Sequence, residues 1–319
     1  MSSPEMSSPE MRSPEMRGAI EAPQSVWRLR WRRFRRERAA MASVVVLAAL
    51  VLFVLAAGPL AAAKGIDPDA TNLLARYDPP SALHWLGTDD AGRDELLRLM
   101  YGGQVSLLVG LVATLVGGAI GIAIGLCAGY FGGLSDALLM RATDGFIALP
   151  LLPLLIVLAA VDLTKLGFSA EFANSGAAGF WRVIVIISIV DWTAVARLVR
   201  AATLSLKERD YVLSAKASGG SAAYVMARHI LPNAATPIIV AGTLTVGRVI
   251  LFESVLSFLG FGIVPPTPSW GNMLNNAQEL VTTAPALAVY PGLLIFITVI
   301  AVNFLGDGLR HAFDPRSGA

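Results

Sequence analysis

The chain is poor in charge. Only 15% of its 319 residues are Asp, Glu, Lys or Arg, whereas soluble domains carry about 25%. Together with 55% hydrophobic residues and a mean hydropathy of +0.63, this deficit excludes an ordinary soluble domain and indicates a membrane protein. The net charge of +2 is too small to indicate a nucleic-acid partner.

Motifs for catalysis, metal binding or nucleotide binding are missing from the sequence as well. The single cysteine, Cys127, lies in an apolar run, which favours buried packing over metal binding or nucleophilic attack. The three histidines are scattered, and the aspartates near His84 lack the spacing of a metal site. There is no G-x-x-x-x-G-K-[ST] phosphate loop and no Ser/His/Asp or Cys/His arrangement. We therefore expect a non-catalytic chain that binds no cofactor or metal.

Long apolar segments are what the chain has instead. A helix needs about 20 apolar residues to cross a bilayer. We therefore predict an all-α integral membrane protein with six transmembrane helices. The predicted spans are 39–63, 104–135, 145–161, 183–196 as the core of the fourth, 234–263, and a last span starting near 284.

The spans divide the chain into four parts. Residues 1–38 are predicted to be a disordered tail with an anchor, and 39–103 the first span and an outer segment. Residues 104–310 form the core with five spans, and 311–319 a second tail.

The N-terminal tail has two features. Residues 1–17 repeat the pattern MSSPEM, whose polar and proline content predicts disorder. Residues 27–38, WRLRWRRFRRER, interleave arginine with aromatic residues. Nucleic-acid binding is one interpretation, but an apolar span follows at once, so a juxtamembrane anchor to the lipid bilayer is favoured. The apolar part is too long, and too far from the start, for a cleaved signal peptide.

The distribution of Lys and Arg predicts the topology. If the N-terminal tail is inside, the inner segments hold 18 of these residues and the outer segments hold six. Positive residues favour the cytoplasmic side. Both termini and the loop 197–233 are therefore predicted to be cytoplasmic.

Small residues recur every fourth position in the second predicted span. Such a stripe lets another helix approach backbone to backbone. We expect it to serve packing against another span or a partner subunit. The residues are Ala113, Gly117, Gly121, Gly125 and Gly129.

Three ionisable residues lie within predicted spans: Asp191, Arg248 and Glu253. A charge inside a span costs about 2.5–3.5 kcal/mol on insertion scales, so these side chains should face the bundle interior. A cross-helix pair of Asp191 with Arg248 is the most natural arrangement. A translocation-path role and a purely structural ion pair both stay open.

The charged segment 197–233 lies between two spans and carries two helical patterns. The first covers 206–218, and the Gly219-Gly220 pair offers a break because glycine tolerates positive φ. Ser221 is predicted to cap a second helix over 221–230, which Leu231-Pro232 should end. Such a helix–turn–helix is large enough to be a docking surface in the water phase.

This segment resembles the "EAA" loop of ABC-importer permeases. Ala215, Gly219, Leu231 and Pro232 fall in the family's register, while Leu213 stands where the family has Glu. Three further motifs resemble the dipeptide/oligopeptide/nickel branch. They are Leu-Gly-Thr-Asp-x-x-Gly-Arg-Asp at 86–94, the stretch 253–271 and the stretch 303–316.

The resemblance implies one permease subunit of an ATP-driven peptide importer in the bacterial inner membrane, with the type I permease fold. The implied partners are a second homologous permease, two ABC ATPase subunits that use ATP and Mg²⁺, and an extracytoplasmic substrate-binding protein. A self-sufficient, ion-coupled secondary transporter is the alternative. The ATPases are implied to act on the loop through Asp210, Tyr211, Ala215, Lys216, Gly219, Gly220, Arg228, His229, Leu231 and Pro232.

Overall fold

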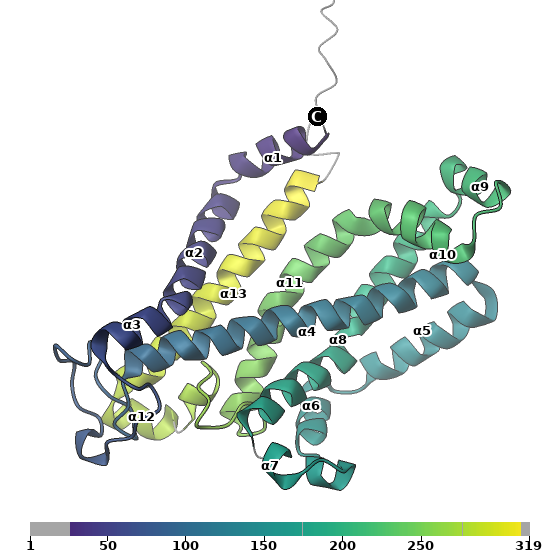
Figure 1. Ribbon diagram of the computed structural model, residues 1–319. Helices are drawn as coiled ribbons and strands as arrows, with labels where there is room; N and C mark the ends of the chain where they lie inside the picture. The colour runs from purple at the N-terminus through teal and green to yellow at the C-terminus, as the bar shows by residue number, and fades with distance from the viewer. Residues whose placement is uncertain (1–25, 174, 276, 314–319) are drawn as a thin grey trace, which may run out of the picture.

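The structure is a computed structural model that describes residues 26–173, 175–275 and 277–313. All regular elements within these ranges are helical, apart from one isolated bridge between Thr88 and Asp94 (Figure 1). The predicted disordered repeat and residues 314–319 of the C-terminal tail lie outside the described residues.

The chain enters through three consecutive helices. They are α1 (Val26–Arg36), α2 (Arg38–Leu55) and α3 (Ala57–Lys64). The predicted first span therefore contains a break at Ala56, and it ends where Gly65 adopts a left-handed conformation with φ of 63°. A 3-10 turn, η1 (Leu73–Ala75), lies in the outer segment that follows.

The second span, α4 (Glu95–Phe131), starts earlier than predicted. Asp94 provides the reason, because its carboxylate accepts a hydrogen bond from the Leu97 amide at 2.8 Å and caps the helix. With 37 residues and a rise of about 1.5 Å per residue, α4 is longer than a bilayer core of about 30 Å.

The glycine stripe of α4 faces α8 (Gly176–Leu206), as the sequence predicts. A Cβ atom at Gly121 would lie 2.6 Å from the Trp192 carbonyl oxygen, and one at Gly125 would lie 2.5 Å from the Ala196 oxygen. Only glycine permits this approach, so α4 and α8 pack backbone to backbone.

The third predicted span is divided. A helix α5 (Gly133–Ala148) starts well before 145, and α6 (Leu151–Ala159) follows at an angle of 89°. Leu149 is extended between them, because the residue before Pro150 is pushed out of the helical region. Pro150 thus produces a full break within the predicted span. Two short elements, η2 (Leu163–Leu166) and α7 (Ala170–Ala173), lead into α8.

The segment after α8 forms α9 (Asp210–Ala217) and α10 (Ala222–Val225). The prediction that a helix ends at Leu231-Pro232 is wrong. A π turn over Met226–Ile230 leads directly into α11 (Leu231–Phe258). Proline is tolerated here because it sits at the start of α11, and the wider turn accommodates its missing N–H.

The remaining elements are η4 (Asn272–Leu274), α12 (Ala277–Thr283) and α13 (Pro285–Phe313). The last helix starts one residue after the predicted 284. The loop before η4 folds back into the bundle, where Trp270 is fully buried and its indole N–H donates to the Leu99 carbonyl at 2.8 Å. The main apolar core lies between α4, α6, α8 and α11.

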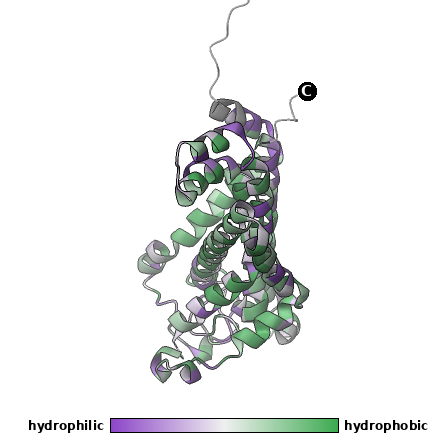
Figure 2. Cartoon of the chain, turned by 90° about the vertical axis from the view of Figure 1, so that its right-hand side faces the viewer, coloured by the Kyte–Doolittle hydropathy of each residue, from purple (hydrophilic) through white to green (hydrophobic). Residues whose placement is uncertain are grey.

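In the part of the chain that the structure describes, four helices are long and apolar enough to cross a membrane, and the bent α5–α6 pair makes up to five. The 31-residue α8 holds the predicted fourth span but is not among these candidates. The predicted count of six spans therefore stays a prediction. Hydrophobic residues dominate the middle of the long helices, and polar residues gather toward their ends (Figure 2).

The start of α1, the end of α13 and the α9–α10 segment lie at one end of the molecule (Figure 1). Helices α3, α7 and α12 lie at the other end. The two described termini and the central loop thus share one side, and its assignment to the cytoplasm stays a prediction.

Candidate functional site

Helix α9 is fixed to the bundle by Val212, which is fully buried. Val212 belongs to an apolar cluster that includes Leu126 of α4, Val195 and Val199 of α8, and Ile230 at the end of the π turn. The short helix therefore shares one apolar cluster with residues of α4 and α8, and it is not a loose tether.

The opposite surface of this segment is unusually apolar for a loop expected in water. Tyr211 is 41% exposed, Leu213 45% and Tyr224 53%. We call these three residues the coupling surface. Large apolar side chains that stay exposed in a segment expected in water suit contact with a partner protein. Leu213 is the position where the resembled family has a carboxylate.

The turn between α9 and α10 uses the predicted residues. Gly219 has φ of 81°, in the left-handed region that favours glycine. A Cβ at Gly220 would lie 2.8 Å from the Ala215 carbonyl oxygen, so this position also needs glycine. The Ser221 hydroxyl accepts from the Tyr224 amide at 3.3 Å, which caps α10 as predicted.

Polar contacts tie the same end of the bundle together. The Lys207 ammonium donates to the Gly129 carbonyl at 3.0 Å, and the Lys216 ammonium lies 4.8 Å from the centre of the Tyr130 ring. Arg200 of α8 donates through both Nε and Nη2 to Asp136 of α5, at 2.5 and 2.6 Å. The Lys216 contact links α9 to α4, and the other contacts link the end of α8 to α4 and α5.

The other predicted loop residues lie around this centre. Asp210, Arg228 and Pro232 are exposed. His229 packs edge-on against Tyr224 with ring centres 5.4 Å apart, and its carbonyl accepts from the Asn233 amide nitrogen at 2.7 Å. The structure brings the ten predicted loop residues to one end of the molecule.

Asp191 and Arg248 lie opposite one another on α8 and α11. The Asp191 Oδ1 and Arg248 Nη2 atoms are 3.1 Å apart, and the same guanidinium donates to the Thr245 hydroxyl at 3.1 Å. The Asp191 side chain is 10% exposed, but that of Arg248 is 44% exposed. A half-exposed guanidinium within a span is not expected to face lipid.

Glu253 does not join this pair. It is fully buried and accepts hydrogen bonds from the Ser106 hydroxyl at 3.0 Å and the Ser257 hydroxyl at 2.8 Å. The Ser106 oxygen in turn accepts from the Trp270 amide at 3.1 Å. The Glu253 carboxyl thus joins α4 and α11 to the folded-back loop.

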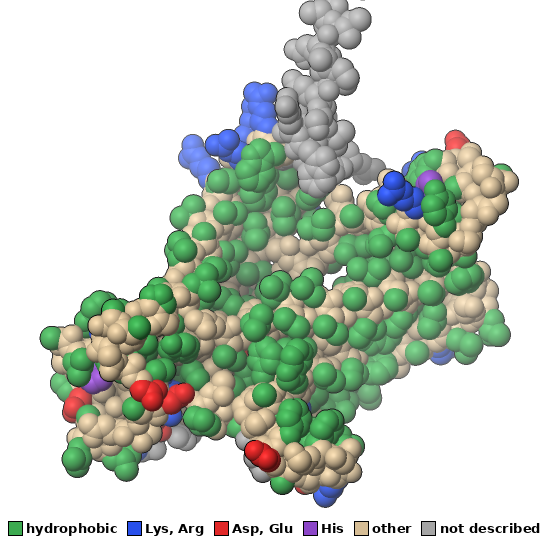
Figure 3. All heavy atoms as spheres, viewed as in Figure 1, with side chains coloured by type: hydrophobic (Ala, Val, Ile, Leu, Met, Phe, Trp, Pro, Cys, Tyr) green, Lys and Arg blue, Asp and Glu red, His purple; other side chains and the backbone are tan. Residues whose placement is uncertain are grey.

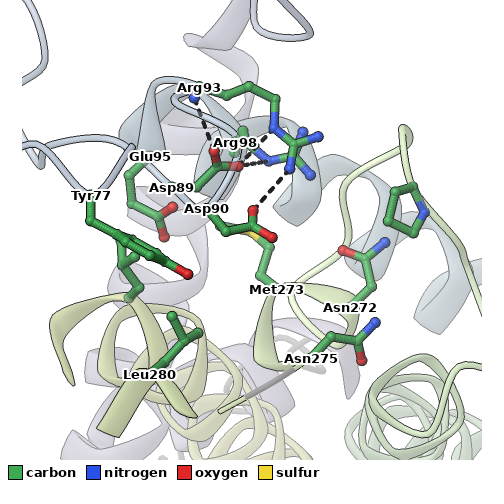
Figure 4. Close-up of a pocket in the computed structure, with 12 residues that line it drawn as sticks. Tyr77, Asp89, Asp90, Arg93, Glu95, Arg98, Asn272, Met273, Asn275 and Leu280 are labelled. Atoms are coloured by element: carbon green, nitrogen blue, oxygen red, sulfur yellow. Dashed lines mark hydrogen bonds and ion pairs between the residues drawn. The ribbon is translucent and has the colours of Figure 1, made fainter. Parts of the chain in front are cut away.

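A polar cavity of about 160 Å³ lies at the opposite end of the molecule (Figure 4). Asp89 organises it: its Oδ2 contacts Arg93 Nε at 2.7 Å and Arg98 Nε at 3.2 Å, while its Oδ1 accepts from the Arg93 amide at 2.9 Å. Glu95, only 2% exposed, lies next to this network. We call this space the Glu95 cavity.

Sequence reasoning did not assign a role to the Glu95 cavity. The 86–94 motif was recognised, but Glu95 and Arg98 were treated as part of a polar loop before the second span. One signal was available: both residues open the long apolar segment, where a charged pair needs an explanation. The contribution of Asn272 and Asn275 from the far loop could not be read from the sequence.

The family model for the "binding-protein-dependent transport system inner membrane component" matches residues 121–318. The chain belongs to this permease family. A second model, for the N-terminal transmembrane domain of oligopeptide transport permease C, matches residues 25–80 of this permease. The sequence-based assignment to the dipeptide/oligopeptide branch is therefore confirmed.

Relatives cover nearly the whole permease. The glutathione transport system permease protein GsiD of Escherichia coli O6:K15:H31 is 41% identical over 293 residues, which is 91% of this chain and 90% of that protein. A Brucella suis protein named as a peptide permease is 38% identical over 287 residues, 89% of each chain. A crystal structure of an amino acid ABC transporter with histidines matches with a TM-score of 0.47 and 16% identity. That match covers 67% of this chain and 93% of the other, and its score is too low to decide the fold.

Family membership settles the class of the permease. It is a non-catalytic, multi-pass subunit of an ABC importer in the inner membrane, and ATP is hydrolysed by separate subunits. The family works with ATPase and substrate-binding partners and carries no cofactor of its own. The alternative of a self-sufficient secondary transporter is thereby set aside.

Proposed function

We propose that this chain forms half of the translocation path of a peptide importer and couples to its ATPases through α9 and α10. The other half of the path comes from a second homologous permease. An extracytoplasmic binding protein delivers the substrate, and two ATPase subunits bind at the cytoplasmic end. The proposed coupling residues are Asp210, Tyr211, Ala215, Lys216, Gly219, Gly220, Arg228, His229, Leu231 and Pro232.

The coupling surface is the observation that carries this proposal. Tyr211, Leu213 and Tyr224 are exposed apolar side chains in a segment that the charge distribution assigns to water. Val212 anchors the same helix in an apolar cluster that includes residues of α4 and α8. A surface that is both apolar and rigidly mounted suits a partner whose movement must be transmitted as rigid-body motion.

Arg248 supports the proposal of a path at the permease interface. Its half-exposed guanidinium must face water or protein. We propose that the Asp191–Arg248 pair faces the second permease across the path. Glu253 is proposed to have a structural role, because its carboxyl is enclosed by hydroxyl donors.

Site-specific crosslinking tests the coupling surface. In a background with Cys127 replaced by Ser, a single cysteine is placed at Leu213 in the assembled importer. A short bis-maleimide, which reacts with one cysteine at each end, should then crosslink the cysteine at position 213 to a cysteine on the ATPase subunit. Leu111, exposed on α4 in the predicted span, is the matched control and should give no product. Equal yields at both positions, or none at Leu213 while the ATPase co-purifies, would contradict the proposal.

The names of the two relatives support peptides as substrates. Uptake of labelled di- and tripeptides should depend on this chain in its native cells and on ATP, with the proton gradient collapsed. Nickel uptake is the matched comparison, because the resembled branch also serves nickel. Loss of nickel uptake with unchanged peptide uptake in a deletion strain would reverse the assignment.

A further inference from the structure

The end of the molecule that holds α3, α7 and α12 is acidic. Between Gly65 and Glu95 the sequence holds seven acidic and two basic residues. Acidic side chains gather at this end in Figure 3, whereas basic ones gather at α1. A partner that approaches this end therefore meets an excess of negative charge, which favours a basic surface.

The charges around the Glu95 cavity are paired, with one exception. Arg93 contacts Asp89 at 2.7 Å and Asp90 at 3.4 Å. Arg98 contacts Asp89 at 3.2 Å and Asp69 at 3.8 Å. Both arginines are thus already engaged by carboxylates, so the cavity offers no free cation to an incoming anion.

Glu95 is the exception. Its Oε1 atom is buried and accepts no hydrogen bond from any described residue. In Figure 4 the carboxyl group points into the space between Tyr77 and Asp90. A buried polar atom without a partner costs about 1–3 kcal/mol, so this carboxyl is suited to a donor supplied from outside.

The size of the cavity limits what can supply that donor. Sites for small molecules usually enclose about 300–1,000 Å³, whereas this cavity has about 160 Å³. Among the described residues no group of three or more His, Cys, Asp or Glu is placed to hold a metal ion. The space suits a single side chain and not a whole peptide or a metal ion.

We propose that the Glu95 cavity receives a lysine or arginine side chain of the extracytoplasmic binding protein. Its cation donates to the Glu95 carboxyl, beside the exposed carboxylate of Asp90. This inference rests on the proposed function, because it needs the acidic end to face the compartment of the binding protein. It adds a defined contact that fixes where that partner docks.

The test uses the complete importer in lipid nanodiscs and the purified binding protein, with docking measured by surface plasmon resonance. Glu95→Gln keeps the size of the side chain and removes its charge. We expect at least a tenfold loss of affinity and a shallower dependence on salt, because the partner's buried cation loses one of the two carboxyl groups that face it. The same amount of assembled importer is immobilised for each variant, so that differences in signal report affinity.

Asp78→Asn is the control, since Asp78 is exposed at the same end and the variant makes the same change from carboxyl to amide outside the cavity lining. It should change the affinity less than twofold. Equal affinity of Glu95→Gln and the unmodified importer, or equal weakening by both variants, would overturn the proposal. If Glu95→Gln releases the second permease from the complex, that subunit and not the binding protein would occupy the cavity, and the proposal would also be overturned. If the unmodified importer binds no binding protein, the proposed function itself fails.

Discussion

The close contact between α4 and α8 allows a quantitative prediction. A Cβ atom at Gly121 or Gly125 would lie 2.6 or 2.5 Å from a carbonyl oxygen of α8, whereas ordinary contacts start near 3.4 Å. The double variant Gly121→Ala/Gly125→Ala must therefore push the helices apart by roughly 0.8 Å, given the limited compressibility of packed interiors.

The energetic balance has two terms. Overpacking costs about 1–3 kcal/mol per site, and alanine gains about 1 kcal/mol over glycine in a helix. The double variant should thus lose about 2 kcal/mol of unfolding free energy, which corresponds to about 3 °C in melting temperature for a chain of this length. Circular dichroism at the helix band, recorded in mild detergent during heating, measures this shift.

A matched control separates packing from composition. Gly118 and Gly242 have no atom within 4 Å of an added Cβ, so Gly118→Ala/Gly242→Ala should melt at the original temperature or above it. If the Gly121/Gly125 variant melts no lower than this control, the backbone-to-backbone contact is not a stabilising feature of the bundle.

Three further predictions concern coupling and buried charge. Gly219→Val should leave membrane insertion intact but uncouple ATP hydrolysis from transport, because valine is strained at φ of 81°; normal uptake per ATP would refute it. Asp191→Asn should lower transport, and reversing both charges of the Asp191–Arg248 pair should restore part of it; an uptake assay in which the swap rescues nothing counts against the pair. Glu253→Leu should reduce the thermal unfolding midpoint more than Glu253→Gln, since it leaves the Ser106 hydroxyl without its acceptor; equal midpoints would contradict a structural role.

Local rules predicted the features that depend on neighbouring residues. The spacing of the α4 glycines, the left-handed Gly219 and the Ser221 cap each follow from short patterns whose geometry is fixed within a turn or two. The pairing of Asp191 with Arg248 was also predicted, because opposite charges in separate spans avoid lipid by facing one another inside the bundle.

Features that depend on distant contacts were missed. Proline at 232 ends a helix in most sequences, but here a π turn absorbs it, and nothing local distinguishes the two outcomes. The sequence did not predict that the loop around Trp270 folds back into the bundle, where its indole N–H donates to the Leu99 carbonyl. The Glu95 cavity needs residues 180 positions apart, such as Asn275, to meet. Such pairings are set by the packed bundle and not by the segments themselves.

The position of α9 has a consequence for communication across the membrane. At one end of the α4–α8 pair, Val212 shares an apolar cluster with residues of both helices. At the other end α4 begins with Glu95, about 55 Å away for 37 residues at about 1.5 Å each. If one stiff pair connects both sites, the coupling free energy between them is reciprocal. Filling the Glu95 cavity should change the affinity of α9 for its ATPase by the same factor by which ATPase binding changes docking at the cavity.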